Sequence, residues 1–137
     1  MNLTLKAREV FANDHYATEA TGATIDKVER RTAECSLTLA NKHRNALGAV
    51  MGGVMFTLAD LAFAAAANSE MVMEEGGLAW VSLGSDIQYL AQPKGMALRA
   101  QANCVKQGRS TCVYHIKISD ELDNLVAVVT TTGMRIN

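Results

Sequence analysis

The chain has 137 residues, of which 49% are hydrophobic and 20% are charged, and its formal net charge at pH 7 is -1. This length suits one domain, residues 1–137, with a sizeable buried core, and the aliphatic content argues against a disordered chain. A net charge so close to zero gives no support for a protein that binds nucleic acid.

Residues 3–12 place Leu3, Ala7 and Phe11 at helical spacing, which predicts a short amphipathic helix packed on the outside of the domain. We expect an N-terminal helical segment over residues 1–20. Charged side chains lie where a signal peptide would need an apolar core, so no targeting segment is expected.

Two strands are predicted next, over residues 22–29 and 32–39, and they are joined tightly at Arg30 and Arg31. The second strand alternates between apolar and polar residues, as a half-buried strand does. The two strands therefore form a hairpin, and a polar loop over residues 40–47 follows it.

A long apolar stretch over residues 45–69 contains a single ionisable side chain, Asp60, which would be costly to bury unpaired. Strong helix formers predict a central helix over residues 53–73, and because apolar residues lie all round it, we expect other structure to enclose it. The glycine pair Gly52 and Gly53 leaves unscreened N–H groups at the positive end of this helix. Such an end is a site for an anion or an oxyanion.

The same stretch has a second interpretation as a membrane span. Residues 46–67 are long enough to cross a bilayer, and Gly48 and Gly52 form a GxxxG match. Against it, many of these residues are Ala or Gly, and a central Asp disfavours insertion by about 3 kcal/mol. The flanking strands can wrap the helix instead.

The rest of the chain has the pattern of β structure. Four strands are predicted over residues 79–92, 97–107, 109–119 and 125–136, and we expect them to follow one another as a meander. One antiparallel sheet curled around one buried helix, an α+β fold, satisfies the whole pattern. Such a sheet leaves two edges, which are commonly paired with another subunit, so a homodimer is expected.

The cysteines and histidines give no sign of a metal centre. Cys35, Cys104 and Cys112 are odd in number and lack metal-ligand spacing, so we interpret them as buried reduced thiols, which favours a reducing cytoplasm. The histidines are scattered, and we interpret His43 as a loop residue and His115 as an outward-facing strand residue.

Several short motifs follow one another in order along the chain. The most specific are Asn45, Gly48, Met51-Gly52-Gly53 and Thr57-Leu58-Ala59-Asp60. Supporting motifs are residues 85–90 leading to Pro93, residues 106–109, Asp120 and residues 125–127. Together, over about residues 15–136, they resemble the hotdog-fold acyl-CoA thioesterases of the phenylacetate-pathway (PaaI) type.

This resemblance implies that Asp60 is the catalytic carboxylate, which either activates water or attacks the thioester carbonyl directly. It also implies that the Gly52 N–H polarises the thioester oxygen, that Asn45 lies beside the substrate carbonyl, and that Ser82 helps to place the water. The chain departs from the pattern at Met51, where many members have histidine. A thioether cannot donate the hydrogen bond that an imidazole could.

The substrate is expected to contact further residues of these motifs. Met51 and Gly53 would border it, and the segment with Lys106, Gly108 and Arg109 would contact coenzyme A, whose phosphates a basic side chain could reach. Each candidate also has a purely structural interpretation, such as a hydrogen-bonded acid, close helix packing, a loop cap, a strand serine or a solvated turn charge.

The spacing along the helix favours a site shared between two chains. Gly52 and Asp60 are eight residues apart, which separates them by about 12 Å along a helix. Two antiparallel helices in a dimer would bring Asp60 of one chain towards Gly52 of the other and create two equivalent sites.

We therefore expect a thioester hydrolase that converts an acyl-CoA or aryl-acyl-CoA to the free acid and coenzyme A, with no cofactor beyond the coenzyme A of the substrate. The resemblance implies a homodimer doubled to a homotetramer, without nucleic-acid or membrane partners. Two alternatives stay open. One is a hydratase or dehydratase of acyl thioesters, which would typically use a histidine where Met51 stands, and the other is a non-catalytic protein that binds acyl thioesters.

Overall fold

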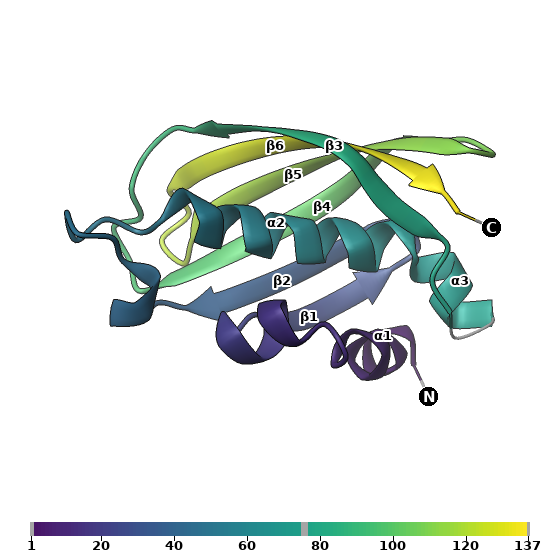
Figure 1. The fold of residues 1–137 in the computed structure, drawn as a ribbon, viewed down its shortest axis with the longest axis horizontal. Helices are drawn as coiled ribbons and strands as arrows, with labels where there is room; N and C mark the ends of the chain where they lie inside the picture. The colour runs from purple at the N-terminus through teal and green to yellow at the C-terminus, as the bar shows by residue number, and fades with distance from the viewer. Residues whose placement is uncertain (1, 75–76, 137) are drawn as a thin grey trace.

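The computed structural model describes residues 2–74 and 77–136. Six strands form one antiparallel sheet, and one long helix accompanies it (Figure 1). In chain order the elements are α1 (Leu3–Phe11), a π-helical turn (Tyr16–Ala20), β1 (Thr24–Glu29), β2 (Thr32–Thr38), a 3-10 turn (Asn41–His43), α2 (Gly52–Ala67), α3 (Ser69–Glu74), β3 (Trp80–Tyr89), β4 (Ala97–Gln107), β5 (Thr111–Asp120) and β6 (Leu125–Arg135).

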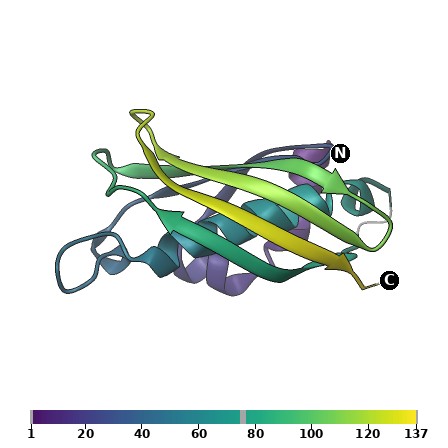
Figure 2. The ribbon, with the colours of Figure 1, turned by 90° about the horizontal axis from the view of Figure 1, so that it is seen from above.

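The order of the strands in the sheet is β1-β2-β4-β5-β6-β3. The predicted hairpin of β1 and β2 is confirmed, and β4, β5 and β6 form a meander. The predicted four-strand meander is wrong for β3, which pairs with β6 at the far edge of the sheet (Figure 2). β4 pairs with β2 instead, with Ala97 opposite Thr38. Alternation of side chains defines the two faces of a strand but not its neighbour, so the sequence pattern missed this crossing.

Helix α2 lies along the concave face of the sheet (Figure 1). Its side chains Leu58, Leu61 and Phe63 are buried against the strands, and Phe63 meets Tyr114 of β5 edge to face with 5.6 Å between ring centroids. The alanines of residues 64–67 have no bulk to hold the helix away from the strands. The expected α+β arrangement, one antiparallel sheet curled around a central helix, is confirmed.

The central helix is shorter than the predicted residues 53–73, because the chain breaks it at Asn68. The Asn68 side-chain oxygen accepts hydrogen bonds from the N–H groups of Ala79 and Trp80, at 2.8 Å each. Its Nδ2 donates to the carbonyls of Ala64 and Trp80. Asn68 therefore ties the end of α2 to the start of β3.

One face of α2 is left uncovered by the rest of the chain. Gly53 and Asp60 are exposed, and Phe56, Thr57 and Ala64 are half-buried, at spacings of three and four residues that place them on one side of the helix. The expectation that other structure encloses the helix on all sides is therefore wrong for the single chain. Among the helices of the described residues, none is both long and apolar enough to cross a membrane.

The edge strand β3 is also exposed. Only its first residue, Trp80, is buried, while Val81 and Leu83 are 41% and 64% exposed. β3 runs antiparallel to α2, because Tyr89 lies against Gly52 at one end and Trp80 contacts Asn68 at the other. The uncovered helix and an open sheet edge with exposed apolar side chains thus lie in the same part of the molecule.

Candidate active site

The N-terminus of α2 presents free backbone donors. Met51 precedes the helix in an extended conformation, with φ -64° and ψ 138°, and its side chain does not cap the helix. Within the described chain, neither the Gly52 N–H nor the Gly53 N–H donates to a protein acceptor. The helix dipole makes this end positive, so both groups are available to an oxyanion.

Asn45 shapes the loop that leads into this helix. Its side-chain oxygen Oδ1 accepts hydrogen bonds from the N–H groups of Leu47 at 2.9 Å and Ala49 at 3.1 Å. Gly48, between them, has a φ of +80°, a conformation that favours glycine. The side-chain oxygen of Asn45 therefore stabilises the loop. The predicted position of Asn45 beside the substrate carbonyl stays a prediction, and only its amide nitrogen, which has no partner among the described residues, is free to act there.

A segment after β3 packs against the helix N-terminus. The Val50 N–H donates to Gln92 Oε1 at 2.8 Å, and Gln92 Nε2 donates back to the Val50 carbonyl at 3.3 Å. The Tyr89 ring lies so close to Gly52 that a Cβ on Gly52 would be 2.7 Å from Tyr89 Cζ. A side chain at position 52 would therefore displace the Tyr89 ring, whereas glycine lets the ring lie against the helix start and leaves its N–H accessible. The sequence reasoning missed both Tyr89 and Gln92 as site residues.

A hollow of about 460 Å³ opens at this end of α2. It is lined by Val50, Gly52, Met55, Tyr89, Leu90, Ala91 and Gln92. Most of the lining is apolar, and its free polar groups include the Gly52 N–H and the Tyr89 hydroxyl. A polar carbonyl attached to an apolar acyl group suits such a lining.

Asp120 holds the loop that continues from this segment. Its carboxylate is fully buried and accepts hydrogen bonds from the N–H groups of Lys94 at 2.8 Å and Gly95 at 3.1 Å, and from Asn124. Burial alone would raise the pKa of Asp120, but these hydrogen bonds outweigh burial and hold the pKa well below its usual range. Asp120 therefore stays ionised and fixes the turn between β3 and β4.

Asp60 lies midway along the uncovered face of α2. Its side chain is exposed in the single chain and has no hydrogen-bond or ion-pair partner among the described residues. The surrounding protein still removes part of its hydration, which raises the pKa of Asp60, and the nearby Asp14 carboxylate raises it further. Both effects make Asp60 a stronger base than an ordinary aspartate. The sequence reasoning did not connect Asp14, which follows α1, with this carboxylate.

One chain does not bring all of the predicted site residues together. Gly52 and Asp60 lie about 12 Å apart along the helix axis. Lys106 lies near the end of β4, and Gly108 and Arg109 follow it in the turn between β4 and β5. This turn is at the opposite end of α2, where the neighbouring Gln107 donates to the Ala67 carbonyl. These residues therefore cannot act on the same carbonyl as Gly52 within a single chain.

Ser82 lies on the edge strand β3, opposite Gly133 of β6, and its side chain is exposed. Met51 is 44% exposed at the mouth of the helix N-terminus, and Gly53 is exposed beside it. All three therefore face solvent in the single chain, and their expected contacts with water or substrate stay predictions.

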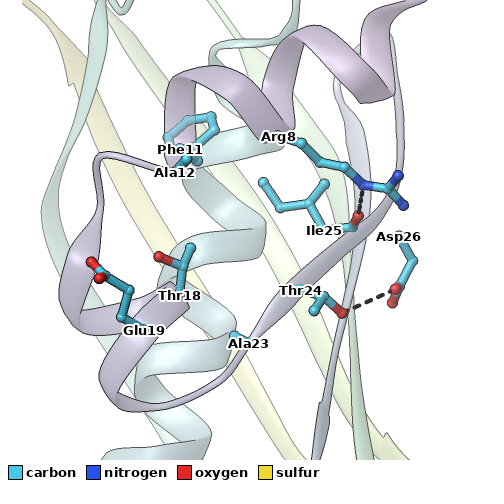
Figure 3. A pocket seen from close by; sticks show the side chains of 9 residues that line it. All are labelled: Arg8, Phe11, Ala12, Thr18, Glu19, Ala23, Thr24, Ile25 and Asp26. Carbon is cyan, nitrogen blue, oxygen red and sulfur yellow. Dashed lines mark hydrogen bonds between the residues drawn. The ribbon is translucent and has the colours of Figure 1, made fainter.

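A second cavity, of about 530 Å³, lies between α1 and β1. Figure 3 shows its lining: Arg8, Phe11, Ala12, Thr18, Glu19, Ala23, Thr24, Ile25 and Asp26. Arg8 Nε donates to the Ile25 carbonyl at 2.7 Å, and the Thr24 hydroxyl donates to Asp26 at 3.2 Å. Because these polar groups are already paired within the chain, the hollow beside Gly52 is the better candidate for a reaction site.

His43 lies in the loop between β2 and α2, as expected, and its side chain is buried there. It is 3% exposed, its Nδ1 accepts a hydrogen bond from the Ala40 N–H, and its Nε2 bonds the Thr21 carbonyl at 2.7 Å. His115 is exposed on β5, as expected. Within residues 2–74 and 77–136, no group of three or more His, Cys, Asp or Glu side chains is arranged to hold a metal ion.

All three cysteines are free thiols. Cys35 and Cys112 are buried, whereas Cys104 is only half-buried, so the expectation of buried thiols holds for two of the three. Burial raises the pKa of the Cys35 thiol to about 12, which keeps it protonated and unreactive.

Comparison with known proteins identifies the family to which this chain belongs. Residues 47–127, more than half of the chain, match the family described as Thioesterase superfamily. The chain belongs to this superfamily. The expected thioester-hydrolase class and the PaaI-type hotdog fold are confirmed by this match, which contains α2, β3, β4 and β5, and by the relatives described next.

Three relatives show how far the similarity extends. Acyl-coenzyme A thioesterase PaaI of Escherichia coli is 33% identical over 123 residues, which cover 89% of this chain and 83% of that protein. Its solved structure superposes with a TM-score of 0.82 at 30% identity and covers 99% of this chain and 97% of that one.

The 1,4-dihydroxy-2-naphthoyl-CoA hydrolase of Listeria monocytogenes is 30% identical over 112 residues, which cover 80% of this chain and 87% of that protein. A hypothetical thioesterase from Streptococcus pneumoniae, solved with coenzyme A, has a TM-score of 0.80 at 27% identity and covers 93% of this chain and 97% of that one. These superfamily relatives match nearly the whole chain.

Proposed function

We propose that this superfamily member is an acyl-CoA thioesterase, which hydrolyses an acyl-CoA or aryl-acyl-CoA to the free acid and coenzyme A. The observation that carries the proposal is the presence on one helix of an unpaired carboxylate with a raised pKa, Asp60, and of free N–H donors at Gly52 and Gly53. The names of the Escherichia coli and Listeria relatives and the coenzyme A in the Streptococcus structure support a coenzyme A ester as substrate.

The proposed site is completed across a homodimer. The uncovered stripe of α2 and the exposed edge strand β3, with Val81 and Leu83, offer an apolar surface that a second copy would cover. A two-fold axis that sets two α2 helices antiparallel brings Asp60 of one protomer towards Gly52 of its partner. This arrangement overcomes the separation of about 12 Å within one chain. Burial at the interface would raise the pKa of Asp60 further.

The reaction needs a base or nucleophile and an oxyanion site. The Gly52 N–H donates to the thioester oxygen and stabilises the negative charge that develops there in the transition state. Asp60 either takes a proton from the attacking water or attacks the carbonyl carbon itself. In the first route the water oxygen forms the new C–O bond, the C–S bond breaks, and the coenzyme A sulfur leaves as a thiolate that takes the proton held by Asp60. In the second route an Asp60 oxygen forms a mixed anhydride as the C–S bond breaks. Water then hydrolyses this anhydride, which releases the free acid, restores the Asp60 carboxylate and supplies the proton that the thiolate takes up.

In this proposal the remaining candidate residues contact or position the substrate. Asn45 and Ser82 would position the carbonyl and the water, and Met51 and Gly53 would border the acyl group. Lys106, Gly108 and Arg109, at the far end of α2, would meet coenzyme A bound to the site of another protomer. A tetramer formed from two such dimers and a cytoplasmic location stay predictions.

Thiol release from a panel of short, medium, long and aryl acyl-CoA esters tests the proposal. We expect turnover of at least one class by the parent protein and loss of most of that rate in Asp60→Asn. Asp26→Asn is the matched control, because Asp26 is an exposed aspartate on β1 that does not line the hollow beside Gly52. If the parent binds acyl-CoA without turning over any ester, the protein is a binding protein, as the methionine at position 51 would permit.

A further inference from the structure

The candidate oxyanion site lacks the imidazole donor that many proteins with a similar motif have at the position of Met51. At position 51 the chain has methionine, and its thioether cannot donate a hydrogen bond to the thioester carbonyl. The free N–H groups of Gly52 and Gly53 remain, but each preorganised oxyanion donor that is removed typically slows such a reaction by about 10²- to 10³-fold. A side-chain donor close to Gly52 would replace the one that position 51 lacks.

Tyr89 places a hydroxyl group at this point. The position that a Cβ would occupy on Gly52 is 2.8 Å from the Tyr89 hydroxyl oxygen. Because a Cβ lies about 2.5 Å from its own backbone nitrogen, that oxygen is within about 5.3 Å of the Gly52 nitrogen. One acceptor can bond two donors, at about 2.9 Å each, only when they are less than about 6 Å apart. The Gly52 N–H and the Tyr89 hydroxyl meet this distance condition for a shared carbonyl oxygen.

The hydroxyl is available, and the backbone that carries it is held. Within the described chain, the Tyr89 hydroxyl has no hydrogen-bond partner, and the side chain is 52% exposed. Tyr89 pairs with Ala127 in the sheet, and the next two N–H groups, of Leu90 and Ala91, both donate to the Val126 carbonyl. The ring also lines the hollow beside Gly52.

We propose that the Tyr89 hydroxyl is the second oxyanion donor of this chain and takes the place of the imidazole that its sequence motif lacks at position 51. Tyr89 donates to the thioester oxygen together with the Gly52 N–H of the same protomer, and its proton stays on the phenol throughout. The inference rests on the proposed thioesterase function, because it assigns a role within that reaction. It also explains why the residue that packs against Gly52 is tyrosine and not phenylalanine.

Tyr89→Phe tests this assignment, since it removes the hydroxyl and keeps the ring. We expect kcat for the best acyl-CoA of the panel to fall by about 10²-fold, with KM changed less than about threefold, because an oxyanion donor acts mainly in the transition state. Tyr16→Phe is the matched control, because Tyr16 is a 68% exposed tyrosine outside the site. Adding Met51→His to Tyr89→Phe supplies a new donor and should recover part of the lost kcat.

The outcomes separate this inference from the proposed function. If the parent turns over an ester, Asp60→Asn does not, and Tyr89→Phe keeps kcat within about twofold of the parent, the tyrosine assignment is overturned and the thioesterase stands. If the parent turns over no ester, the proposed function fails, and the assignment fails with it. A rise in KM together with a fall in kcat, with no recovery on adding Met51→His, would show that Tyr89 only shapes the pocket, which also overturns the donor role.

Discussion

One added methyl group at Gly52 tests the packing of Tyr89 over the helix N-terminus. In Gly52→Ala the new Cβ would lie 2.7 Å from Cζ and 2.8 Å from the hydroxyl oxygen of Tyr89. Carbon atoms in ordinary contact are about 3.5 to 4.0 Å apart, so the tip of the ring must move by about 1 Å. Gly53→Ala is the matched control for stability, because a Cβ at Gly53 would meet no atom within 4 Å.

The effect of Gly52→Ala on stability should be small. Tyr89 is 52% exposed, so its ring can swing outwards at a cost that we place below about 1 kcal/mol, less than overpacking in a closed core. Alanine also favours a helix over glycine by up to about 1 kcal/mol, which offsets part of this cost. We expect the Tm of Gly52→Ala to lie within about 4 °C of that of Gly53→Ala.

The rate of catalysis should respond more strongly than the stability. A displacement of about 1 Å next to the reacting carbonyl can slow a reaction by up to about a hundredfold, so we expect kcat for thiol release to fall about tenfold to a hundredfold in Gly52→Ala. A crystal structure of the variant would show the displaced ring. Parental kcat in Gly52→Ala would refute the reasoning, because the site would then tolerate a misplaced Tyr89.

Asp60→Asn should raise the free energy of unfolding near pH 7 by less than about 1 kcal/mol, because solvent screens the charge, and a slightly higher Tm would show it. The folded-state pKa of Asp60 is raised above its ordinary value of 3.8, so ionisation costs stability above that value, and the gain should vanish as the pH falls below it. For the same reason, the acid limb of the kcat/KM profile should lie above pH 3.8 and move down in Asp14→Asn, which removes the neighbouring charge. Gln92→Ala leaves the buried N–H and carbonyl of Val50 without their partner, and urea denaturation should show a loss of about 1 to 2 kcal/mol together with a lower kcat. The pKa of Asp120 is lowered in the fold, so its stabilising effect is present above its ordinary pKa and is lost as the pH falls below about 4; Asp120→Asn should flatten this acid dependence of Tm while lowering Tm at pH 7.

The local features of the fold were predictable from the sequence. The helix formers of residues 53–67 and the alternation in β4, β5 and β6 are signals contained within each segment, and the structure bears them out. The end of the helix was not predictable, because Asn68 is fixed by the backbone of Ala79 and Trp80, which lie 11 and 12 residues further along the chain. A residue that breaks a helix through such distant partners gives no local signal.

The place of β3 in the sheet required information that a single segment does not contain. Its predicted range was close to the observed strand, but its partner β6 begins 36 residues after β3 ends. The same limit applies to the site. Asp60 and the glycine pair stand out in the sequence as one acid and two glycines in an apolar stretch, whereas Tyr89 and Gln92 reach Gly52 and Val50 only through the fold.

The uncovered face of α2 is a feature that the sequence predicted to be buried and that the single chain leaves exposed. An all-round apolar helix predicted complete enclosure, and the single chain covers only part of it. The difference is explained if a second copy of the chain covers this face, because residues buried in an assembly are apolar even where the single chain exposes them. The same dimer would then account for the site shared between two chains and for the exposed apolar side chains of β3.

Subunit complementation tests the shared site most directly. Asp60→Asn removes the base. Gly52→Pro removes the N–H donor at the first residue of the helix, where the backbone suits proline, since the φ of -64° and ψ of 138° at Met51 suit the residue before a proline. The Cβ of this proline displaces the Tyr89 ring of the same protomer only, so the other site of a hybrid dimer keeps its Gly52 and Tyr89. Each variant alone should show little thiol release. A hybrid dimer of the two has one site with both groups intact, so an equal mixture after co-expression should recover about a quarter of the parental activity. A mixture that remains as inactive as the separate variants would contradict the account, because it would place Asp60 and Gly52 in a site within one chain.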